Sequence, residues 1–537
     1  MSFVRVRRLL TTKIRPSGGL LLALLSLMLF AVNLILGAAG LRGTDQYWYV
    51  GDLWMSQISG QPVTNAIYPT ATGINADIST NGLPPRIHNV PVTYLASLAH
   101  QLGASDYLAW VYVNVLIALI VAVVVYVVAT KLKYSCAFIA PTLFLSFPLT
   151  LWLSINALAD MSLALGSCLL ILGATCISRA DADEDRKFTA GLLLIATASV
   201  LMFYTRDNYV LLFPALILFT FWASRSRRKR WVPAAAILSV TALLAALKPS
   251  VLPQYPHAGL LSMLMTGTPS DNVLMSPYYS LGNVPFSASE FIFKMMNGLK
   301  DAILPSGPSE LISELPVIVV VVGALFFLRK DDTSRILRFW MSVVFAIYLT
   351  TAAIFQSENR YIFALVPFMA LFGAGLWNQF IRPSARLGWR ANVLKLALVC
   401  FLIVCIFGSF LMARAYRTQA TVETAQTSRL ISGFAAEPMG SVLALTETAK
   451  LLPLTYAAVP RPVLAINTRI NTTAQAARLI EIWKVRVLVG ASDKDRQYFS
   501  SAVDLAFGGG AKLISEPSYE TPGGPIKLWL IELETNK

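Results

Sequence analysis

Residues 42–52 read Arg-Gly-Thr-Asp-Gln-Tyr-Trp-Tyr-Val-Gly-Asp and follow directly on an apolar run at about residues 18–39. They therefore lie where a chain leaves a lipid bilayer, and the aromatic residues among them favour the level of the lipid headgroups. If the stretch is helical, Asp45, Tyr49 and Asp52 share one face, because seven residues make nearly two turns. Two carboxylates on one face beside aromatic rings suit a lid, a structural cap or a catalytic base.

The composition is that of a membrane protein. Of the 537 residues, 56% are hydrophobic and 14% are charged, whereas soluble domains carry about 25% charged residues. The formal net charge is +15, but the basic residues fall in short runs between apolar segments, where they orient membrane spans. No basic run is interleaved with a nucleic-acid-binding motif, so we expect no nucleic-acid partner. The cysteines lie in apolar segments and the histidines are scattered, which argues against disulfides and a zinc site.

Eleven apolar segments are candidates for membrane spans, since crossing the hydrocarbon core takes roughly 20 apolar residues. The first is longer than the apolar core of a signal peptide and lacks a small-residue cleavage site, so we expect it to be retained. The expected spans are 18–39, 107–130, 135–153, 157–178, 188–204, 208–223, 232–247, 315–328, 336–355, 361–380 and 391–413.

The distribution of Lys and Arg predicts how these spans are oriented. With a cytoplasmic N-terminus, every predicted inside loop contains two or more basic residues, whereas the short outside connections contain few. This is the asymmetry of the positive-inside rule. The sequence therefore predicts a polytopic α-helical membrane protein with about 11 transmembrane helices, and an odd number of spans places the C-terminal domain outside the cytoplasm.

The predicted chain has two parts, a transmembrane domain at 1–413 and a soluble α/β domain at 414–537. The transmembrane domain includes two long extracytoplasmic loops, 40–106 and 248–314, which we expect to fold against the membrane surface. In the tail, strand-like runs alternate with helical patterns, which predicts a partly parallel sheet. The predicted strands are 441–445, 463–466, 485–490 and 527–533, the predicted helices of the tail are 474–483 and 495–507, and interfacial helices are predicted at 92–102 and 290–299.

Ionisable side chains beside membrane spans are candidates for function, because placing them in lipid is costly. A group of carboxylates and arginines at one membrane face suits sugar transfer from a lipid phosphate. A carboxylate accepts the proton of an acceptor hydroxyl, and Arg holds the leaving phosphate. The predicted topology gathers these candidates at the outer face: Asp45, Asp52, Arg86, His88, Asn156, Asp160, Arg206, Lys248, Glu358 and Arg360.

Four short motifs occur in this set. They are Thr44-Asp45-Gln46-Tyr47-Trp48-Tyr49, Asn156-Ala-Leu-Ala-Asp160-Met-Ser-Leu, Thr205-Arg206 before an aromatic, Leu and Pro run, and Asn359-Arg360-Tyr361 followed by Pro367. In this order the chain resembles the polytopic lipid-linked-sugar glycosyltransferases of the GT-C superfamily, especially the bacterial protein-mannosyltransferase-like and lipid A aminoarabinose-transferase-like branch. Gln46 replaces the second acid of the family motif, which argues against a tandem-carboxylate or metal-binding mode. No WWDYG-like sequence is present, which argues against an oligosaccharyltransferase.

The resemblance implies that Asp45 is the catalytic base, that Asp160 is a second catalytic acid residue, and that Arg206 and Arg360 contact phosphate or sugar. Structural roles stay open beside these: a helix cap for Asp45 or Asp160, and surface ion pairs for the two arginines. We expect no cofactor and no assigned metal ligand, and the residues leave open whether a divalent metal assists. The further residues expected to bind substrate are Asp52, Arg86, His88, Asn156, Lys248 and Glu358.

The sequence thus predicts an inverting glycosyltransferase, a hexosyl- or pentosyltransferase, of the bacterial plasma (inner) membrane. It would move a sugar from a polyprenyl-phosphate donor to a glycan, lipid or protein acceptor of the cell envelope, on the outer face. One alternative is an O-antigen-type ligase or polymerase with a diphosphate-linked donor, although loop 248–314 has no Arg. Another is a polytopic lipid or sugar transporter, although such proteins tend to show repeated halves and none is visible here.

Overall fold

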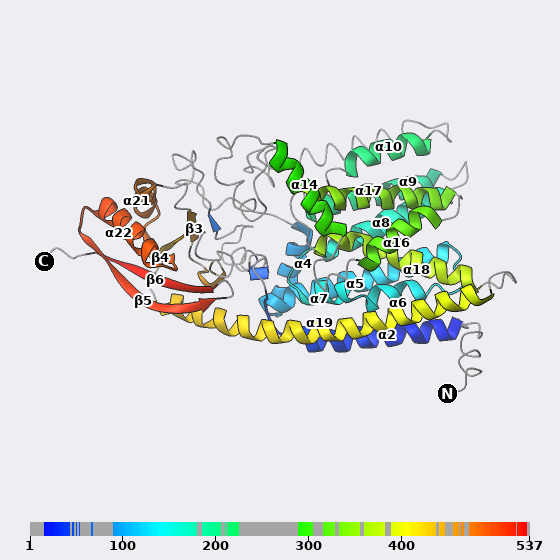
Figure 1. The fold of residues 1–537 in the computed structure, drawn as a ribbon, viewed down its shortest axis with the longest axis horizontal. Coiled ribbons are helices and arrows are strands. Elements are labelled where there is room, and N and C mark those ends of the chain that lie inside the picture. Colours follow the sequence, from blue (N-terminus) through cyan, green and yellow to red (C-terminus); the bar gives the residue numbers. More distant parts are fainter. Residues whose placement is uncertain are drawn as a thin grey trace.

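A helical bundle lies at one end of the molecule and an α/β domain at the other, and the long helix α19 (Gly388–Ala436) runs along both (Figure 1). The architecture comes from a computed structural model. It describes residues 16–42, 46–47, 50, 53, 66–67, 90–179, 185–205, 209, 212–224, 288–303, 315–327, 332–354, 359–381, 388–436, 440–445, 454, 456–459, 461, 463–466, 472–521 and 524–533.

The bundle confirms the predicted polytopic α-helical membrane architecture. Within the described residues, seven helical stretches are long and apolar enough to cross a membrane, and each falls on a predicted span. The number eleven stays a prediction, because α10 (Leu212–Ser224) and α16 (Leu315–Phe327) are short and segment 232–247 lies outside the described residues. The seven stretches lie in α2 (Pro16–Gly37), α5 (Asp106–Lys131), α8 (Met161–Ser178), α9 (Asp185–Thr205), α17 (Asp332–Ile354), η6 with α18 (Asn359–Leu365 and Val366–Ile381), and α19.

The predicted span at 135–153 is two short helices, α6 (Ile139–Ser146) and α7 (Pro148–Ile155). The break falls at Pro148, whose ring disfavours helix at the preceding residue and which lacks an N–H. The Oγ of Ser409 on α19 donates to the carbonyl oxygen of Ser146 (3.2 Å), and the Oγ of Ser146 donates to that of Ser26 on α2 (3.2 Å). Irregular backbone at membrane depth is tolerated where neighbouring protein groups satisfy it, so α2 and α19 stabilise the break.

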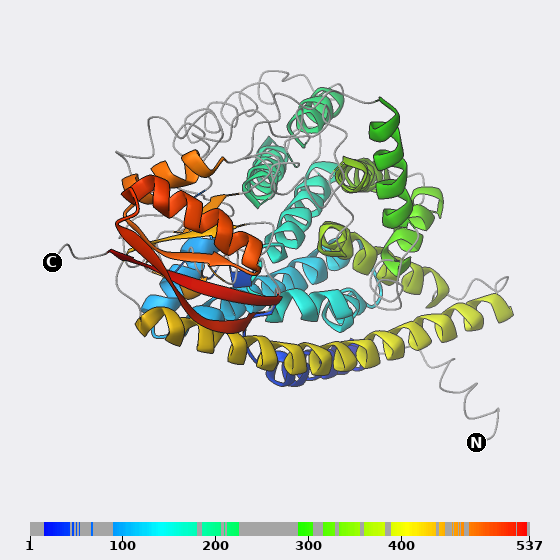
Figure 2. The same ribbon diagram turned by 60° about the vertical axis from the view of Figure 1, so that its left-hand side comes forward.

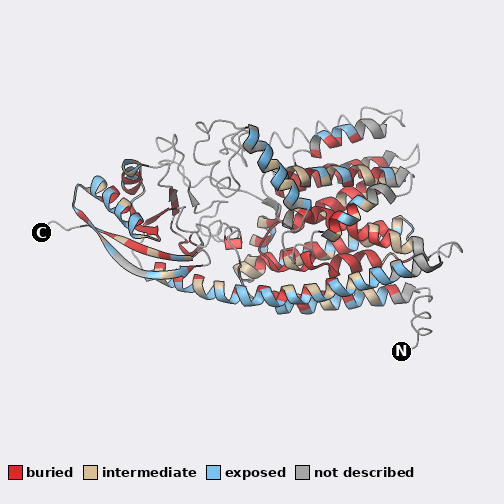
Figure 3. Ribbon diagram, in the orientation of Figure 1, coloured by how far each residue is buried: buried red, intermediate tan, exposed pale blue. Residues whose placement is uncertain are grey.

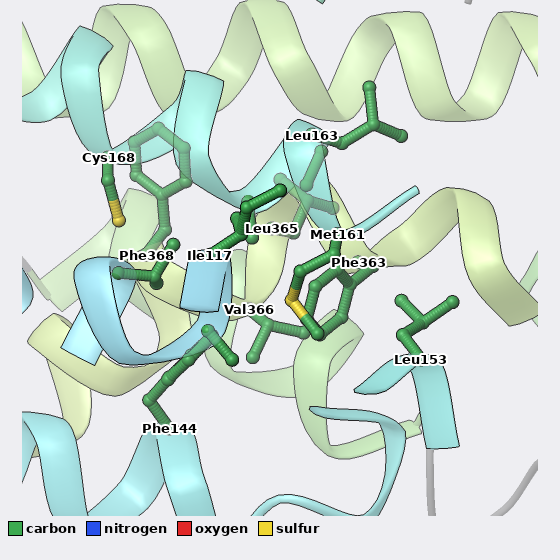
Figure 4. Packing of buried hydrophobic residues seen from close by; sticks show 14 of the residues in the cluster. Ile117, Phe144, Leu153, Met161, Leu163, Cys168, Phe363, Leu365, Val366 and Phe368 are labelled. Atoms are coloured by element: carbon green, nitrogen blue, oxygen red, sulfur yellow. The ribbon is translucent and has the colours of Figure 1, made fainter. Parts of the chain in front are cut away.

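The centre of the bundle is apolar and densely packed. α8 and α18 are buried over most of their lengths, whereas α2 and α19 expose one side (Figure 3). Where α6, α8 and η6 meet, Phe144, Met161 and Phe363 interleave (Figure 4), and the ring centroids of Phe144 and Phe363 lie 6.2 Å apart. This packing fixes η6 against the start of α8.

Helices are present at both segments predicted to be interfacial, as α4 (Val90–Gln101) and α14 (Ala288–Ile303). α4 packs against α5, and α14 packs against α17. At 12 and 16 residues, both are shorter than the roughly 20 residues that a membrane span needs.

Six strands of the described residues form one sheet in the order β1-β3-β2-β4-β6-β5. The first four are parallel, and β6 pairs antiparallel with both β4 and β5, which confirms the predicted partly parallel sheet. The edge strand β1 comes from the predicted loop 40–106, so this loop contributes to the C-terminal sheet. The strands are β1 (Ala66–Ile67), β2 (Ser441–Leu445), β3 (Val463–Ile466), β4 (Val485–Gly490), β5 (Ala511–Thr521) and β6 (Gly524–Leu533).

Two layers of helix cover the sheet. On one face, α21 (Thr473–Ile482) and α22 (Asp493–Phe507) bury Leu479 and Phe499 against the strands. On the other face, the last turns of α19 bury Leu430 and Phe434.

α19 is therefore shared between the bundle and the α/β domain. Its 49 residues extend over about 73 Å at 1.5 Å per residue. The helix continues without interruption through position 413, where the predicted domain boundary falls. The guanidinium of Arg461 donates to the carbonyl oxygen of Phe434 at 2.6 Å, close to the end of the helix. This bond satisfies one of the carbonyls that a helix C-terminus leaves unpaired.

We predict that Phe434→Ala destabilises the α/β domain by about 3–5 kcal/mol, because it leaves a cavity where a 3%-exposed ring now packs. Val422→Ala on the same helix is the matched control, since Val422 is 55% exposed, and its effect is expected within about 0.5 kcal/mol. Unfolding of this domain in the purified protein is followed by hydrogen–deuterium exchange of the buried strands β2 and β4 over a denaturant series. Equal transition midpoints for the two variants would contradict a structural role of α19 in the domain.

Candidate functional site

Two of the predicted site residues, Asn156 and Asp160, lie in the turn between α7 and α8. Both are 1% exposed, and the three residues between them are also buried. Arg360 lies in η6, where its backbone is described and its side chain is not. The other predicted site residues lie outside the described residues: Asp45, Asp52, Arg86, His88, Arg206, Lys248 and Glu358. We therefore define the site from the described neighbours of these residues, starting from the turn 156–160.

Gln46, the residue after Asp45, connects the first motif to this turn. Its Nε2 donates to Asn156 Oδ1, and its Oε1 accepts a hydrogen bond from the backbone N–H of Ala157 at 3.1 Å. The same Oε1 lies 3.0 Å from the hydroxyl of Tyr416 on α19, which donates to it. The side chain is 3% exposed. A buried group that donates at one end and accepts at the other matches an amide.

Asn114 and Tyr107 of α5 hold the turn through its backbone. The Nδ2 of Asn114 lies 2.8 Å from the carbonyl oxygens of Asn156 and Leu158, and 3.2 Å from that of Leu153. The Tyr107 hydroxyl donates to the carbonyl oxygen of Ile155 at 2.7 Å. The end of α7 leaves carbonyl groups without partners inside the helix, and α5 supplies the donors that they need.

The third and fourth motifs reach the same turn. The hydroxyls of Ser162 and Thr205 lie 2.5 Å apart and are buried, and Thr205 directly precedes Arg206. η6, which contains Arg360, packs against both α7 and α8. The structure thus brings described residues of all four motifs to the segment 156–162, although they are far apart in the sequence.

The turn lies at the end of the bundle that faces the α/β domain. In Figures 1 and 2 the sheet lies beyond this end, and α2 begins at the opposite end. Tyr47, the next residue after Gln46, accepts a hydrogen bond from Thr427 of α19 at 3.0 Å. Its ring centroid lies 5.7 Å from that of Tyr456, which belongs to the C-terminal part. The α/β domain therefore contacts the segment that carries the first motif.

Burial sets the ionisation of this aromatic pair. It raises the pKa of Tyr47 above its ordinary value, and it raises the pKa of Tyr456 to about 12. Both phenols therefore stay protonated and uncharged at neutral pH. They provide hydrogen-bonding groups and apolar surface to the first motif, and the charges for catalysis have to come from other side chains.

No group of three His, Cys, Asp or Glu side chains that could hold a metal ion occurs within the part of the chain that the structure describes. Asp45 and Asp52 lie outside that part.

Gln46, Asn114, Tyr107 and Tyr416 were not predicted as site residues. One of them has a visible signal in the sequence, since Asn114 is an amide in the middle of an apolar span. Polar residues in such positions usually bond to a neighbouring helix. In the sequence Gln46 stands out only because the family motif has an acid at this position. Its hydrogen-bond partners are 110, 111 and 370 residues away, so no local pattern indicates them.

Comparisons with known proteins bear on the fold. No protein-family model and no curated protein sequence matches the chain. The structure of ArnT from Cupriavidus metallidurans bound to undecaprenyl phosphate is similar, with a TM-score of 0.59 and 14% identity over 95% of this chain and 97% of that one. Its apo state gives a TM-score of 0.57 and 12% identity over the same shares.

The archaeal oligosaccharyltransferase AglB from Archaeoglobus fulgidus, in complex with an inhibitory peptide and a dolichol-phosphate, gives a TM-score of 0.50. The identity is 11%, and the match covers 93% of this chain and 74% of that one. At such identities the similarity concerns the fold. The chain has the GT-C fold, as its four motifs predicted.

We predict that Gln46→Glu destabilises the bundle by about 1–3 kcal/mol at neutral pH, because an ionised carboxyl has no hydrogen to donate to Asn156 Oδ1. A protonated carboxyl has one, so folding favours the neutral form and raises the carboxyl's pKa above the unfolded value of about 4.3. The stability of the variant is therefore closest to that of the wild type below about pH 4.3, where the carboxyl is protonated in both states. The loss of stability grows as pH rises through the folded pKa.

Thermal unfolding between pH 4 and 8 measures this effect. Gln419→Glu is the control, because Gln419 is an exposed glutamine on α19. A Gln46→Glu variant that melts with the control at every pH would show that the amide is not required.

Proposed function

We propose that the protein is a glycosyltransferase that moves a sugar from a polyprenyl-phosphate donor to a hydroxyl of a cell-envelope acceptor. The reaction would take place at the membrane face next to the α/β domain, which is the outer face of a bacterial plasma membrane in the predicted orientation. The main support is that Gln46 and Thr205 bond to the segment 156–162 while η6 packs against the two helices that flank the turn. The GT-C fold adds to it, since two structures of this fold hold undecaprenyl phosphate and a dolichol-phosphate.

The environment of the turn suits chemistry that depends on charge. Its residues from Asn156 to Asp160 are at most 3% exposed, and their polar groups bond to side chains from α5 and the first motif. Attraction between a cation and a phosphate is stronger in such a place than in water. Fixed donors that need no reorganisation during the reaction lower the barrier further.

In the proposed mechanism, Asp45 accepts the proton of the acceptor hydroxyl while that oxygen attacks the anomeric carbon of the sugar. The bond between this carbon and the phosphate oxygen breaks, and the polyprenyl phosphate leaves with both bonding electrons. Attack from the side opposite the phosphate inverts the anomeric configuration. Arg206 and Arg360 neutralise the growing charge on the phosphate, a role for which the planar guanidinium is well suited.

Asp160 is assigned to the sugar, as the second acid of the site. The hydrogen bonds of Asn156 and Ala157 to Gln46 connect the turn with the residue next to Asp45. They would keep the two acids in register. The remaining predicted residues, Asp52, Arg86, His88, Lys248 and Glu358, are proposed to line the donor and acceptor sites.

We predict that Asp45→Asn lowers transfer by roughly 100- to 10,000-fold, the usual contribution of a positioned general base. Asp160→Asn should lower it as well, because the amide keeps the shape of the side chain and removes the charge. Transfer from a radiolabelled polyprenyl-phosphate sugar to envelope acceptors is the assay. Asp504→Asn is the control, an exposed aspartate on α22. Full activity of the Asp45→Asn variant would remove the proposed base.

We also predict a preference for the monophosphate donor. A diphosphate carries additional negative charge, and only Arg206 and Arg360 are assigned to the phosphate. The second phosphate of a diphosphate donor would therefore lack a charge-assisted hydrogen bond, which corresponds to a rate loss of roughly tenfold or more. The matched polyprenyl-diphosphate sugar should be transferred at least that much more slowly. Equal rates for both donors would favour the ligase or polymerase alternative.

A further inference from the structure

Three arginines near the outer end of α2 have no part in the proposed reaction: Arg42, Arg414 and Arg417. Lys and Arg normally concentrate at the cytoplasmic ends of membrane spans, and these three lie at the other end of the bundle. Gly37, the last residue of α2, packs closely against Ala413 of α19: a Cβ at position 37 would lie 3.4 Å from the Cα and Cβ of Ala413. This contact shows which part of α19 lies beside the end of α2. Arg414 follows directly, at the height where the apolar part of α2 ends.

The three residues lie close to the C-terminal end of α2 along the chain or on the neighbouring helix α19. Arg414 and Arg417 are three residues apart, share one face of α19 and are exposed. The Nη1 of Arg417 lies 3.5 Å from the carbonyl oxygen of Leu36, to which it donates. The guanidinium carbon of Arg42 lies 5.5 Å from the ring centre of Tyr416. Tyr416 stands between Arg414 and Arg417 in the sequence. We refer to Arg42, Arg414 and Arg417 as the arginine patch.

Neither helix neutralises the patch. Residues 16–42 and 388–422 contain no Asp or Glu, and the first acid beyond them on α19 is Glu423. A helix C-terminus does attract cations, but the single contact of Arg417 meets that need. Arg414 stays exposed beside it, so its guanidinium is accessible to an anionic group at the same height.

The surface next to the patch is apolar. α2 exposes Leu24, Met28 and Ile35, and α19 exposes Ile403 and Phe407. Figure 3 shows these two helices as a layer that is exposed along its length, in contrast with the buried helices behind it. A surface of this kind, below a cluster of guanidinium groups, is complementary to an amphiphile with long apolar chains and an anionic headgroup.

We propose that the arginine patch binds the phosphate headgroup of an anionic phospholipid of the adjoining leaflet, with its acyl chains along α2 and α19. Guanidinium groups bind phosphate oxygens through paired hydrogen bonds, and basic residues at a membrane surface attract anionic lipids. The bound lipid would lie close to the turn 156–160, because Arg42 covers Tyr416, the Tyr416 hydroxyl donates to Gln46, and Gln46 bonds to the turn. The binding itself does not depend on the proposed function.

The test measures binding of fluorescent phosphatidylglycerol to the purified full-length protein in neutral detergent, with phosphatidylcholine as the reference lipid. Each basic residue near a membrane surface contributes about 1 kcal/mol toward anionic lipid, so Arg414→Gln/Arg417→Gln should weaken phosphatidylglycerol binding roughly thirtyfold. Arg429→Gln/Arg496→Gln removes the same charge from exposed positions farther along the chain and should leave binding unchanged. Arg414→Lys/Arg417→Lys should retain most of it.

Three results would overturn the proposal. Equal binding of the two lipids, or equal loss in the two Gln double variants, would show that the patch does not select a headgroup. Displacement of phosphatidylglycerol by an equimolar amount of polyprenyl phosphate would assign the patch to the donor. A change from dimer to monomer in Arg414→Gln/Arg417→Gln, without a change in lipid affinity, would assign it to a second copy of the chain. If that double variant does not fold, Arg414→Gln alone, at an exposed position, should still weaken binding severalfold.

Discussion

Polar groups that are buried in an apolar bundle have to find their partners inside the protein, and the turn between α7 and α8 is where this constraint shapes the molecule. Each unpaired buried group would cost about 1–3 kcal/mol. Asn114 and Tyr107 satisfy the carbonyls of the turn, and Gln46 satisfies the amide groups of Asn156 and Ala157. The turn therefore has one favourable position, which is set by residues from two other parts of the chain, α5 and the first motif.

The same constraint explains what was predictable from the sequence. Apolar length alone locates α2, α5 and α8, because crossing a membrane requires it. Short apolar runs that lie between helical patterns locate β2, β3 and β4, which are buried strands of the sheet. These features are local, and the prediction succeeded wherever a local pattern decides the structure.

Features that depend on distant partners were missed. The break at Pro148 is stable because Ser409 and Ser26 lie beside it, so residues 135–153 still read as one span. β5 contains Glu516 and Pro517 and becomes a strand through its pairing with β6. β1 is two residues long and is a strand because β3 offers a free edge. For the site, the motifs predicted which segments converge, whereas the side chains that hold them together depend on contacts across the fold.

Gln46 illustrates why a motif alone is an incomplete guide. Read against the family pattern, it is a lost carboxylate. In the structure its amide donates to Asn156 and accepts from Ala157 and Tyr416, and a carboxylate could not make all of these bonds while ionised. The position next to the proposed base thus has a structural task, which favours a mechanism with a single base at this motif.

α19 extends this argument from the bundle to the α/β domain. The helix satisfies the break at Ser146 through Ser409, contacts Gln46 through Tyr416, bonds to Tyr47 through Thr427, and enters the sheet core at Leu430. From Tyr416 to Leu430 it rises about 21 Å. A continuous helix keeps this distance constant, and the contact between Tyr47 and Tyr456 adds a second connection. The α/β domain is therefore held at a constant height above the turn, whereas a hinged lid would need a break in α19 that the helix does not have.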